Sequence, residues 1–178
     1  MTRYHPLLVA LHWLLAVLIL AGLIIGGTVL AETPNDDPGK LLALRLHMGS
    51  GIAILVLMLI RLGTRLMAAG PPHADIGNPA LNTAGVWAHW GLYLLVLAMA
   101  GSGLLLANMA GLPAIVFGGS GDPLPADFND LTPRTVHGVL ATALGLLIAA
   151  HVAAGLYHQF IRRDGLFARM WFGRRDAD

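Results

Sequence analysis

Residues 137–151 read HGVLATALGLLIAAH, an uncharged and apolar stretch with a histidine at each end. It lies within a longer run, from about Val136 to Ile161, that contains no aspartate, glutamate, lysine or arginine. About 20 consecutive apolar residues are enough for an α-helix to cross a bilayer. The stretch therefore predicts a membrane-spanning helix that carries histidines at two depths.

Three further runs of mainly apolar residues precede this one. Together the four runs predict membrane spans over residues 7–30, 41–62, 86–112 and 136–161. In the second span, the long side chain of Arg45 can reach the interface. The first span could instead be a cleavable signal peptide, but its apolar stretch is longer than the usual signal core. With 56% hydrophobic and 12% charged residues, the composition also departs from that of soluble domains. We expect residues 1–178 to form a single all-α domain, an integral membrane four-helix bundle.

The composition also limits the chemistry. The chain has no cysteine, which excludes disulfides, thiolate-bound zinc, iron–sulfur clusters and the attachment motif of c-type haem. It has eight histidines, so histidine is the expected ligand of any metal or haem iron. A net charge of +1, with no basic run interleaved with aromatic residues, gives no indication of a nucleic-acid partner.

The positively charged residues predict the orientation. Segments rich in lysine and arginine stay on the cytoplasmic side of a membrane. One side of the predicted bundle has eight of the eleven basic residues: Arg3, Arg61, Arg65, Arg162, Arg163, Arg169, Arg174 and Arg175. The other side has Lys40, Arg45 and Arg134, together with six acidic residues. Both termini are therefore expected in the cytoplasm.

Four histidines form two pairs at matching depths. His137 and His151 are 14 residues apart, which places them on nearly the same helix face and about 21 Å apart along the axis. His47 enters the membrane from the outside and can pair with His137, whereas His12 enters from the cytoplasm and can pair with His151. Any one of them alone could be an interfacial side chain. The joint pattern predicts two haem b groups stacked across the membrane, with these histidines as axial iron ligands.

Two more histidines lie on the cytoplasmic side. His158 is seven residues beyond His151, on nearly the same face and about 10 Å closer to the cytoplasm, and His89 enters from the same side. Titratable groups beside the inner haem would suit a quinone, which takes up protons with electrons. At the outer haem, Arg45 and Arg134 could bind haem propionates or attract an anionic reactant.

Glycines near the histidines could provide the flat space that a haem needs, although glycine is also common at ordinary membrane helix contacts. They are Gly49, Gly51, Gly101, Gly103 and Gly138.

Several motifs resemble the bacterial cytochrome b561 family over nearly the whole chain. They are His12-Trp13, residues 46–52 (LHMGSGI), Ala88-His89, the series His137, His151 and His158, and the tail at residues 166–170 (LFARM). The resemblance is strongest to short four-helix members that oxidise superoxide and reduce ubiquinone. It implies that His12 and His151 bind one haem, that His47 and His137 bind the other, and that His89 and His158 serve the quinone.

Three functions remain open on the sequence. The first is an enzyme that passes electrons from periplasmic superoxide to ubiquinone, although the acidic outer loops would steer an anion poorly. The second is an electron-carrying membrane anchor that docks a periplasmic redox protein. The third is a transporter or proton relay without haem, which the lack of carboxylates within the spans and of paired broken helices disfavours.

Overall fold

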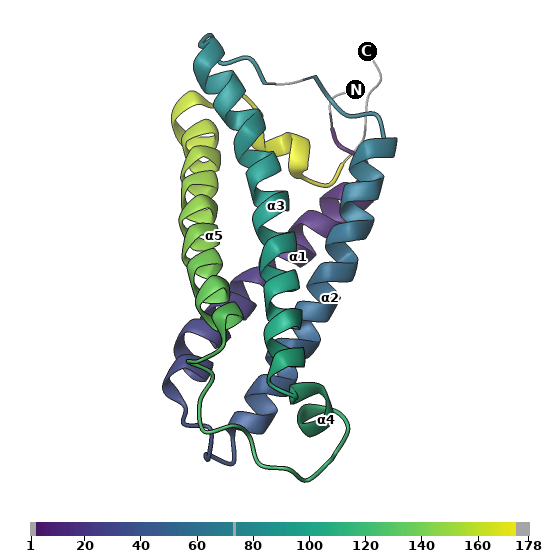
Figure 1. The fold of residues 1–178 in the computed structure, drawn as a ribbon. Helices are drawn as coiled ribbons and strands as arrows, with labels where there is room; N and C mark the ends of the chain where they lie inside the picture. The colour runs from purple at the N-terminus through teal and green to yellow at the C-terminus, as the bar shows by residue number, and fades with distance from the viewer. Residues whose placement is uncertain (1–2, 73, 174–178) are drawn as a thin grey trace.

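The computed structural model describes residues 3–72 and 74–173, so Arg174 and Arg175 lie outside the described residues. Four long helices form a bundle (Figure 1), and the described residues contain no strand. The long helices are α1 (Pro6–Ile24), α2 (Lys40–Met67), α3 (Pro79–Met109) and α5 (Thr132–Leu156). The predicted all-α bundle of four helices is confirmed.

Four short elements complete the fold. Two are π-helical turns that continue long helices: η1 (Ile25–Leu30) follows α1 and η2 (Tyr157–Arg162) follows α5. The others are α4 (Leu112–Val116), which follows α3, and the 3₁₀-helix η3 (Phe167–Met170) near the C-terminus. Single π-helical turns within α-helices often occur at functional sites.

Apolar side chains cover the outside of the bundle as well as its core. The main core cluster, halfway along the helices, consists of Leu15, Ile54, Met58, Tyr93, Val96 and Leu144. Large apolar residues elsewhere are exposed, including Val17 at 65% and Leu146 at 69%. Such a surface would be unstable in water and fits a lipid environment. All four long helices are long and apolar enough to cross a membrane.

The helices are not equally closely packed. The main contacts run between α3 and α5, between α1 and α2, and between α2 and α3. The pair α1 and α5 is not among them, and only Pro133 and Leu144 of α5 are buried. Helix α5 therefore packs mainly against α3, and α1 mainly against α2.

Helix ends differ from the predicted spans where the boundary depends on capping. Helix α3 begins at Pro79, because the Asn78 side chain accepts hydrogen bonds from the next backbone amides and proline suits the first helical position. It ends at Met109 rather than at residue 112, since Gly111 adopts a φ of +66° before α4 begins. Hydropathy locates the apolar part of a helix but does not detect these caps.

The C-terminal strap, residues 164–173, closes the end of the bundle at which α1 begins. The Trp13 indole N–H donates to the carbonyl of Met170 at 2.9 Å, and Arg3 donates to three backbone carbonyls of the strap. Arg169 reaches across to the carbonyl of Pro72 at 2.7 Å. The strap thus joins the N-terminal residues to the connection between α2 and α3, beside the helix turn that carries His12.

Candidate functional site

The structure brings the four paired histidines together as two sets, one near each end of the bundle. The rings of His47 on α2 and His137 on α5 have centroids 6.2 Å apart and planes at 82°. The rings of His12 on α1 and His151 on α5 also have centroids 6.2 Å apart, with planes at 74°. All four side chains are half-buried. We call these sets the outer pair and the inner pair.

The spacing of both pairs fits a single iron between two imidazoles. A metal–imidazole bond is about 2 Å long, so two rings bound on opposite sides of one metal have centroids roughly 6 Å apart. A haem iron needs only two protein ligands because the porphyrin supplies the other four. Within the described ranges, no cluster of three or more histidine, aspartate or glutamate side chains could hold a bare metal ion. The donor set therefore fits haem better than a mononuclear metal site.

Two glycines allow close packing against the outer pair. A Cβ atom on Gly26 would lie 3.1 Å from Cε1 of His47, and one on Gly103 would lie 3.0 Å from Cε1 of His137. By contrast, Gly49, Gly51 and Gly101 would have no neighbour within 4 Å. Of these glycines, only Gly103 was expected from the sequence to make space beside a histidine ring and does so. Gly26 in η1 also does so, but nothing in the sequence indicated it.

A serine on α3 orients one ring of the outer pair. The hydroxyl of Ser102 lies 2.9 Å from Nδ1 of His137 and donates to the carbonyl of Met99, also at 2.9 Å. A hydroxyl has one proton, so it must accept from Nδ1–H of His137. This tautomer leaves Nε2 of His137 without a proton. In the same pair, Nδ1 of His47 is buried and has no hydrogen-bond partner among the described residues.

His89 extends the inner pair into a group of three rings. Its ring centroid lies 5.3 Å from that of His151. Its Nδ1 atom is 2.6 Å from the carbonyl of Gly85, which accepts the hydrogen bond and fixes the tautomer. His89 is also an exposed residue in this structure.

His158 lies in η2 beside the C-terminal strap. Its Nδ1 atom is 2.6 Å from Oδ2 of Asp164, and Nε of Arg162 is 3.3 Å from the same oxygen. Partial burial alone would raise the pKa of the Asp164 carboxyl, but hydrogen bonds from His158, the Leu166 amide and Arg162 outweigh it and lower that pKa. The histidine and the carboxylate thus form a polar dyad just beyond the end of α5.

The predicted outer cations have different environments. Arg45 is exposed, and its Nε donates to the carbonyl of Val116 at 2.9 Å, so it joins α2 to the end of α4. Arg134 lies near enough to His137 and Lys40 to act on both electrostatically. The Lys40 side chain is buried and donates to the carbonyls of Leu30 and Thr33. Of these three cations, Arg134 is the one that acts electrostatically on a histidine of the outer pair.

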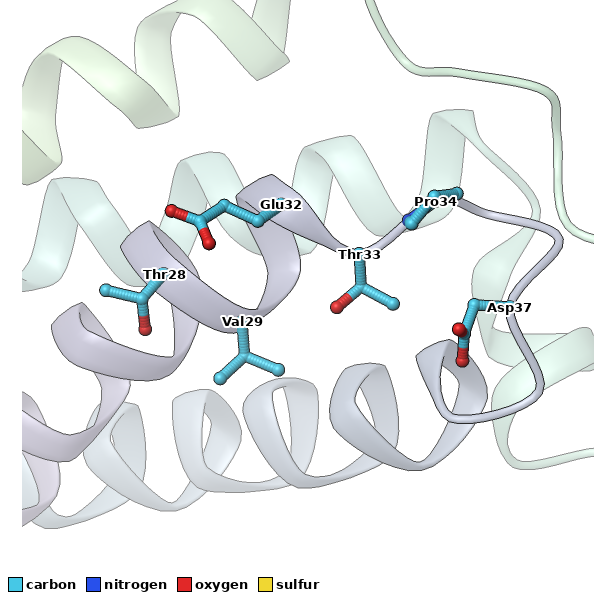
Figure 2. Close-up of a pocket in the computed structure, with 6 residues that line it drawn as sticks. All are labelled: Thr28, Val29, Glu32, Thr33, Pro34 and Asp37. Atoms are coloured by element: carbon cyan, nitrogen blue, oxygen red, sulfur yellow. The ribbon is translucent and has the colours of Figure 1, made fainter.

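An open pocket of about 480 Å³ lies at the outer end, between η1 and the loop that follows it (Figure 2). Its lining includes two carboxylates, Glu32 and Asp37. Threonine, proline and valine side chains complete it: Thr28, Thr33, Pro34 and Val29. This acidic hollow is unfavourable for an anion and more suitable for a cationic group of another molecule.

Comparisons with known proteins agree with this architecture. The family profile described as prokaryotic cytochrome b561 matches residues 3–173. "Cytochrome b561 homolog 2" of Escherichia coli is 29% identical over 99% of this chain and 94% of its own length. "Probable superoxide oxidase CybB" of Yersinia pestis is 29% identical, with 94% and 95% covered. "Cytochrome b562" of Cereibacter sphaeroides is 30% identical, with 94% of each covered. The chain belongs to the prokaryotic cytochrome b561 family, whose members carry out membrane electron transfer with haem b.

Proposed function

We propose that this cytochrome b561 protein is a di-haem superoxide oxidase, with His47 and His137 as ligands of an outer haem b and His12 and His151 as ligands of an inner one. The observation that carries the proposal is the pair of equal 6.2 Å ring separations, one near each end of α5. When bound, the two haems supply one-electron redox centres near opposite faces of the membrane.

The overall reaction balances with two superoxide anions. Each loses one electron and becomes dioxygen, and ubiquinone gains both electrons and two protons to become ubiquinol. Electron donation at a haem edge needs no open coordination position, so two histidines on each iron are compatible with it. Support for superoxide comes from the relative named as a probable superoxide oxidase and from Arg134, a cation beside the outer pair.

The chain's own side chains suit proton delivery at the cytoplasmic end. The ring of His89 lies beside that of His151, and the Nδ1–H of His89 donates to the carbonyl of Gly85. His158 is held by Asp164 in a fixed orientation. Each is a candidate general acid for a quinone oxygen within hydrogen-bond distance.

This assignment requires a specific orientation in the inner membrane of a bacterium, with the inner pair and both termini toward the cytoplasm. Basic residues gather at the end of the bundle that the strap closes, among them Arg162, Arg163 and Arg169. By the positive-inside rule they support this orientation. Alkaline phosphatase fused after the strap should be inactive, whereas the same enzyme inserted in the loop after η1 should be active.

The reaction can be tested on purified protein in detergent or nanodiscs. A superoxide-generating system should reduce the b-type bands, and added ubiquinone should reoxidise them. Superoxide dismutase should prevent the reduction, and catalase should not. Reduction that persists with dismutase present, or no reduction at all, would contradict superoxide as the donor.

A second function is favoured by the outer pocket. Glu32 and Asp37 give this surface a negative character that would suit a basic periplasmic redox protein, for which the chain would serve as a membrane anchor that carries electrons to or from ubiquinone. A stoichiometric soluble partner that co-purifies, and whose binding is lost in a Glu32→Gln/Asp37→Asn variant, would favour this alternative. Full turnover by the isolated chain would count against it.

A further inference from the structure

Helix α2 carries an arginine at the position that corresponds to the inner histidine of α5. Arg61 is 14 residues after His47, the same interval that separates His137 from His151. Fourteen residues bring a helix back to nearly the same face about 21 Å further along. The face of α2 that presents His47 to the outer pair therefore presents Arg61 at the depth of the inner pair.

Contacts with α1 and α3 hold the Arg61 side chain at the depth of the inner pair. Its Nη1 donates to the carbonyl of Leu8, one helical turn before His12. The guanidinium carbon lies 5.8 Å from the ring centroid of Tyr93, one turn after His89. Arg61 also acts electrostatically on both histidines of the inner pair. The guanidinium thus lies beside this pair, at a junction of three helices.

The cation has no anionic partner in the part of the chain that the structure describes. The charged or titratable groups that act on it are Tyr93, Arg65 and Tyr4, none of which is a carboxylate. Neither described ion pair includes Arg61. A positive charge within a membrane is costly unless a counter-charge or hydrogen-bond acceptors compensate it.

Tyr93 adds a second donor at the same place, and its hydroxyl lies near enough to Arg61 to interact with it. The residue is only 6% exposed, and its hydroxyl has no hydrogen-bond partner among the described residues. A buried hydroxyl without a partner costs about 1–3 kcal/mol. A single anionic acceptor between this hydroxyl and the guanidinium would satisfy both groups.

We propose that Arg61 and Tyr93 form a receptor for a propionate carboxylate of the inner haem. Arginine has five N–H donors, of which the Leu8 carbonyl uses one, so a carboxylate can be bound by two of the others. The tyrosine hydroxyl supplies a further donor. This inference rests on the proposed function, because it takes the inner pair as haem ligands.

Arg65 provides a matched control. It is one turn further along α2 and carries the same charge, but its guanidinium carbon lies over Trp90 at 5.5 Å and over Tyr93 at 5.9 Å. It is thus closer to the cytoplasmic end than Arg61. A general effect of removing a positive charge would be similar in Arg61→Gln and Arg65→Gln, whereas loss of a propionate contact would be confined to Arg61→Gln.

The test measures haem content and the two midpoint potentials in the full-length protein. In Arg61→Gln, the inner haem should become harder to reduce by about tenfold in its equilibrium constant, or about 59 mV for a one-electron couple. It should also be lost faster to apomyoglobin, while the outer haem is unchanged and reports that the bundle is folded. Arg61→Lys and Tyr93→Phe should show smaller shifts in the same direction, and Arg65→Gln little or none.

Two results would overturn the inference. One is an equal shift in Arg61→Gln and Arg65→Gln, or no shift in either. The other is a raised KM for ubiquinone in Arg61→Gln with unchanged haem potentials and retention, which would make Arg61 a quinone contact. The haem count of the wild-type protein and of His151→Ala separates these outcomes from a failure of the proposed function, because it tests the inner haem without reference to Arg61.

Discussion

Replacement of Ser102 by alanine tests how the protein controls the outer haem. In the structure, the Ser102 hydroxyl accepts a hydrogen bond from Nδ1–H of His137 at 2.9 Å while it donates to Met99. An acceptor on the second nitrogen makes a histidine ligand more electron-donating. Such a ligand favours ferric over ferrous iron, so loss of the hydroxyl should raise the midpoint potential of the outer haem.

The size of the effect follows from the strength of one hydrogen bond. A neutral hydrogen bond contributes about 0.5–1.5 kcal/mol. Since a tenfold change in a one-electron equilibrium is about 59 mV and about 1.4 kcal/mol, the expected rise is about 20–65 mV. The Met99 carbonyl also acts on His137, and if it replaced the serine as acceptor, the rise would be at the lower end.

A spectroelectrochemical titration that resolves the two b-type components provides the assay. Ser50→Ala is the matched control, because Ser50 donates to the backbone carbonyl of His47 at 2.9 Å and not to a ring nitrogen. Only Ser102→Ala should move a potential, and only that of the outer haem. An unchanged or lowered potential, or equal shifts in both serine variants, would refute the assigned role of the hydroxyl.

Three further predictions concern packing, pH and the strap. Gly103→Ala should weaken binding of the proposed outer haem, since its Cβ would lie 3.0 Å from Cε1 of His137, whereas Gly101→Ala, which has open space around it, should keep full haem content. Equal haem content in both variants would contradict the need for a glycine beside His137. Burial raises the pKa of the Asp164 carboxyl, but hydrogen bonds outweigh burial and lower that pKa. The ionised carboxylate therefore stabilises the folded protein fully above pH about 4, and this stabilisation is lost as the pH falls through the lowered pKa. The Tm of Asp164→Asn should therefore lie below that of the wild type at pH 7, with a gap that narrows on acidification; a gap that is constant with pH would be inconsistent with this. Trp13→Phe removes the bond to Met170, worth about 0.5–1.5 kcal/mol, and should speed proteolysis of the strap without altering haem content; unchanged cleavage would argue against the tether.

The depth of each histidine along the bundle could be predicted from the sequence, because the rise and rotation per residue of an α-helix are fixed. The interval from His137 to His151 therefore predicted an outer and an inner ring on α5, and topology predicted which partners, His47 and His12, lie at the same depth. The structure brings the same four side chains together. Their role as haem ligands stays a prediction.

Contacts across helices could not be predicted in the same way. The approach of Gly26 to His47 depends on a π-helical turn, and the contact from Ser102 to His137 depends on how α3 is rotated against α5. Neither has a sequence signature of its own. Arg61 is different, because its interval from His47 equals the interval between the two α5 histidines, whereas the positive-inside rule uses it only as one basic residue among several.

The number of haems per chain tests the central claim most directly. Pyridine haemochrome analysis of purified wild-type protein, His137→Ala and His151→Ala should give two haems, one and one, with different potentials for the haem that each variant retains. A single haem in the wild type, or two haems kept in either variant, would contradict the assignment of one haem to each histidine pair.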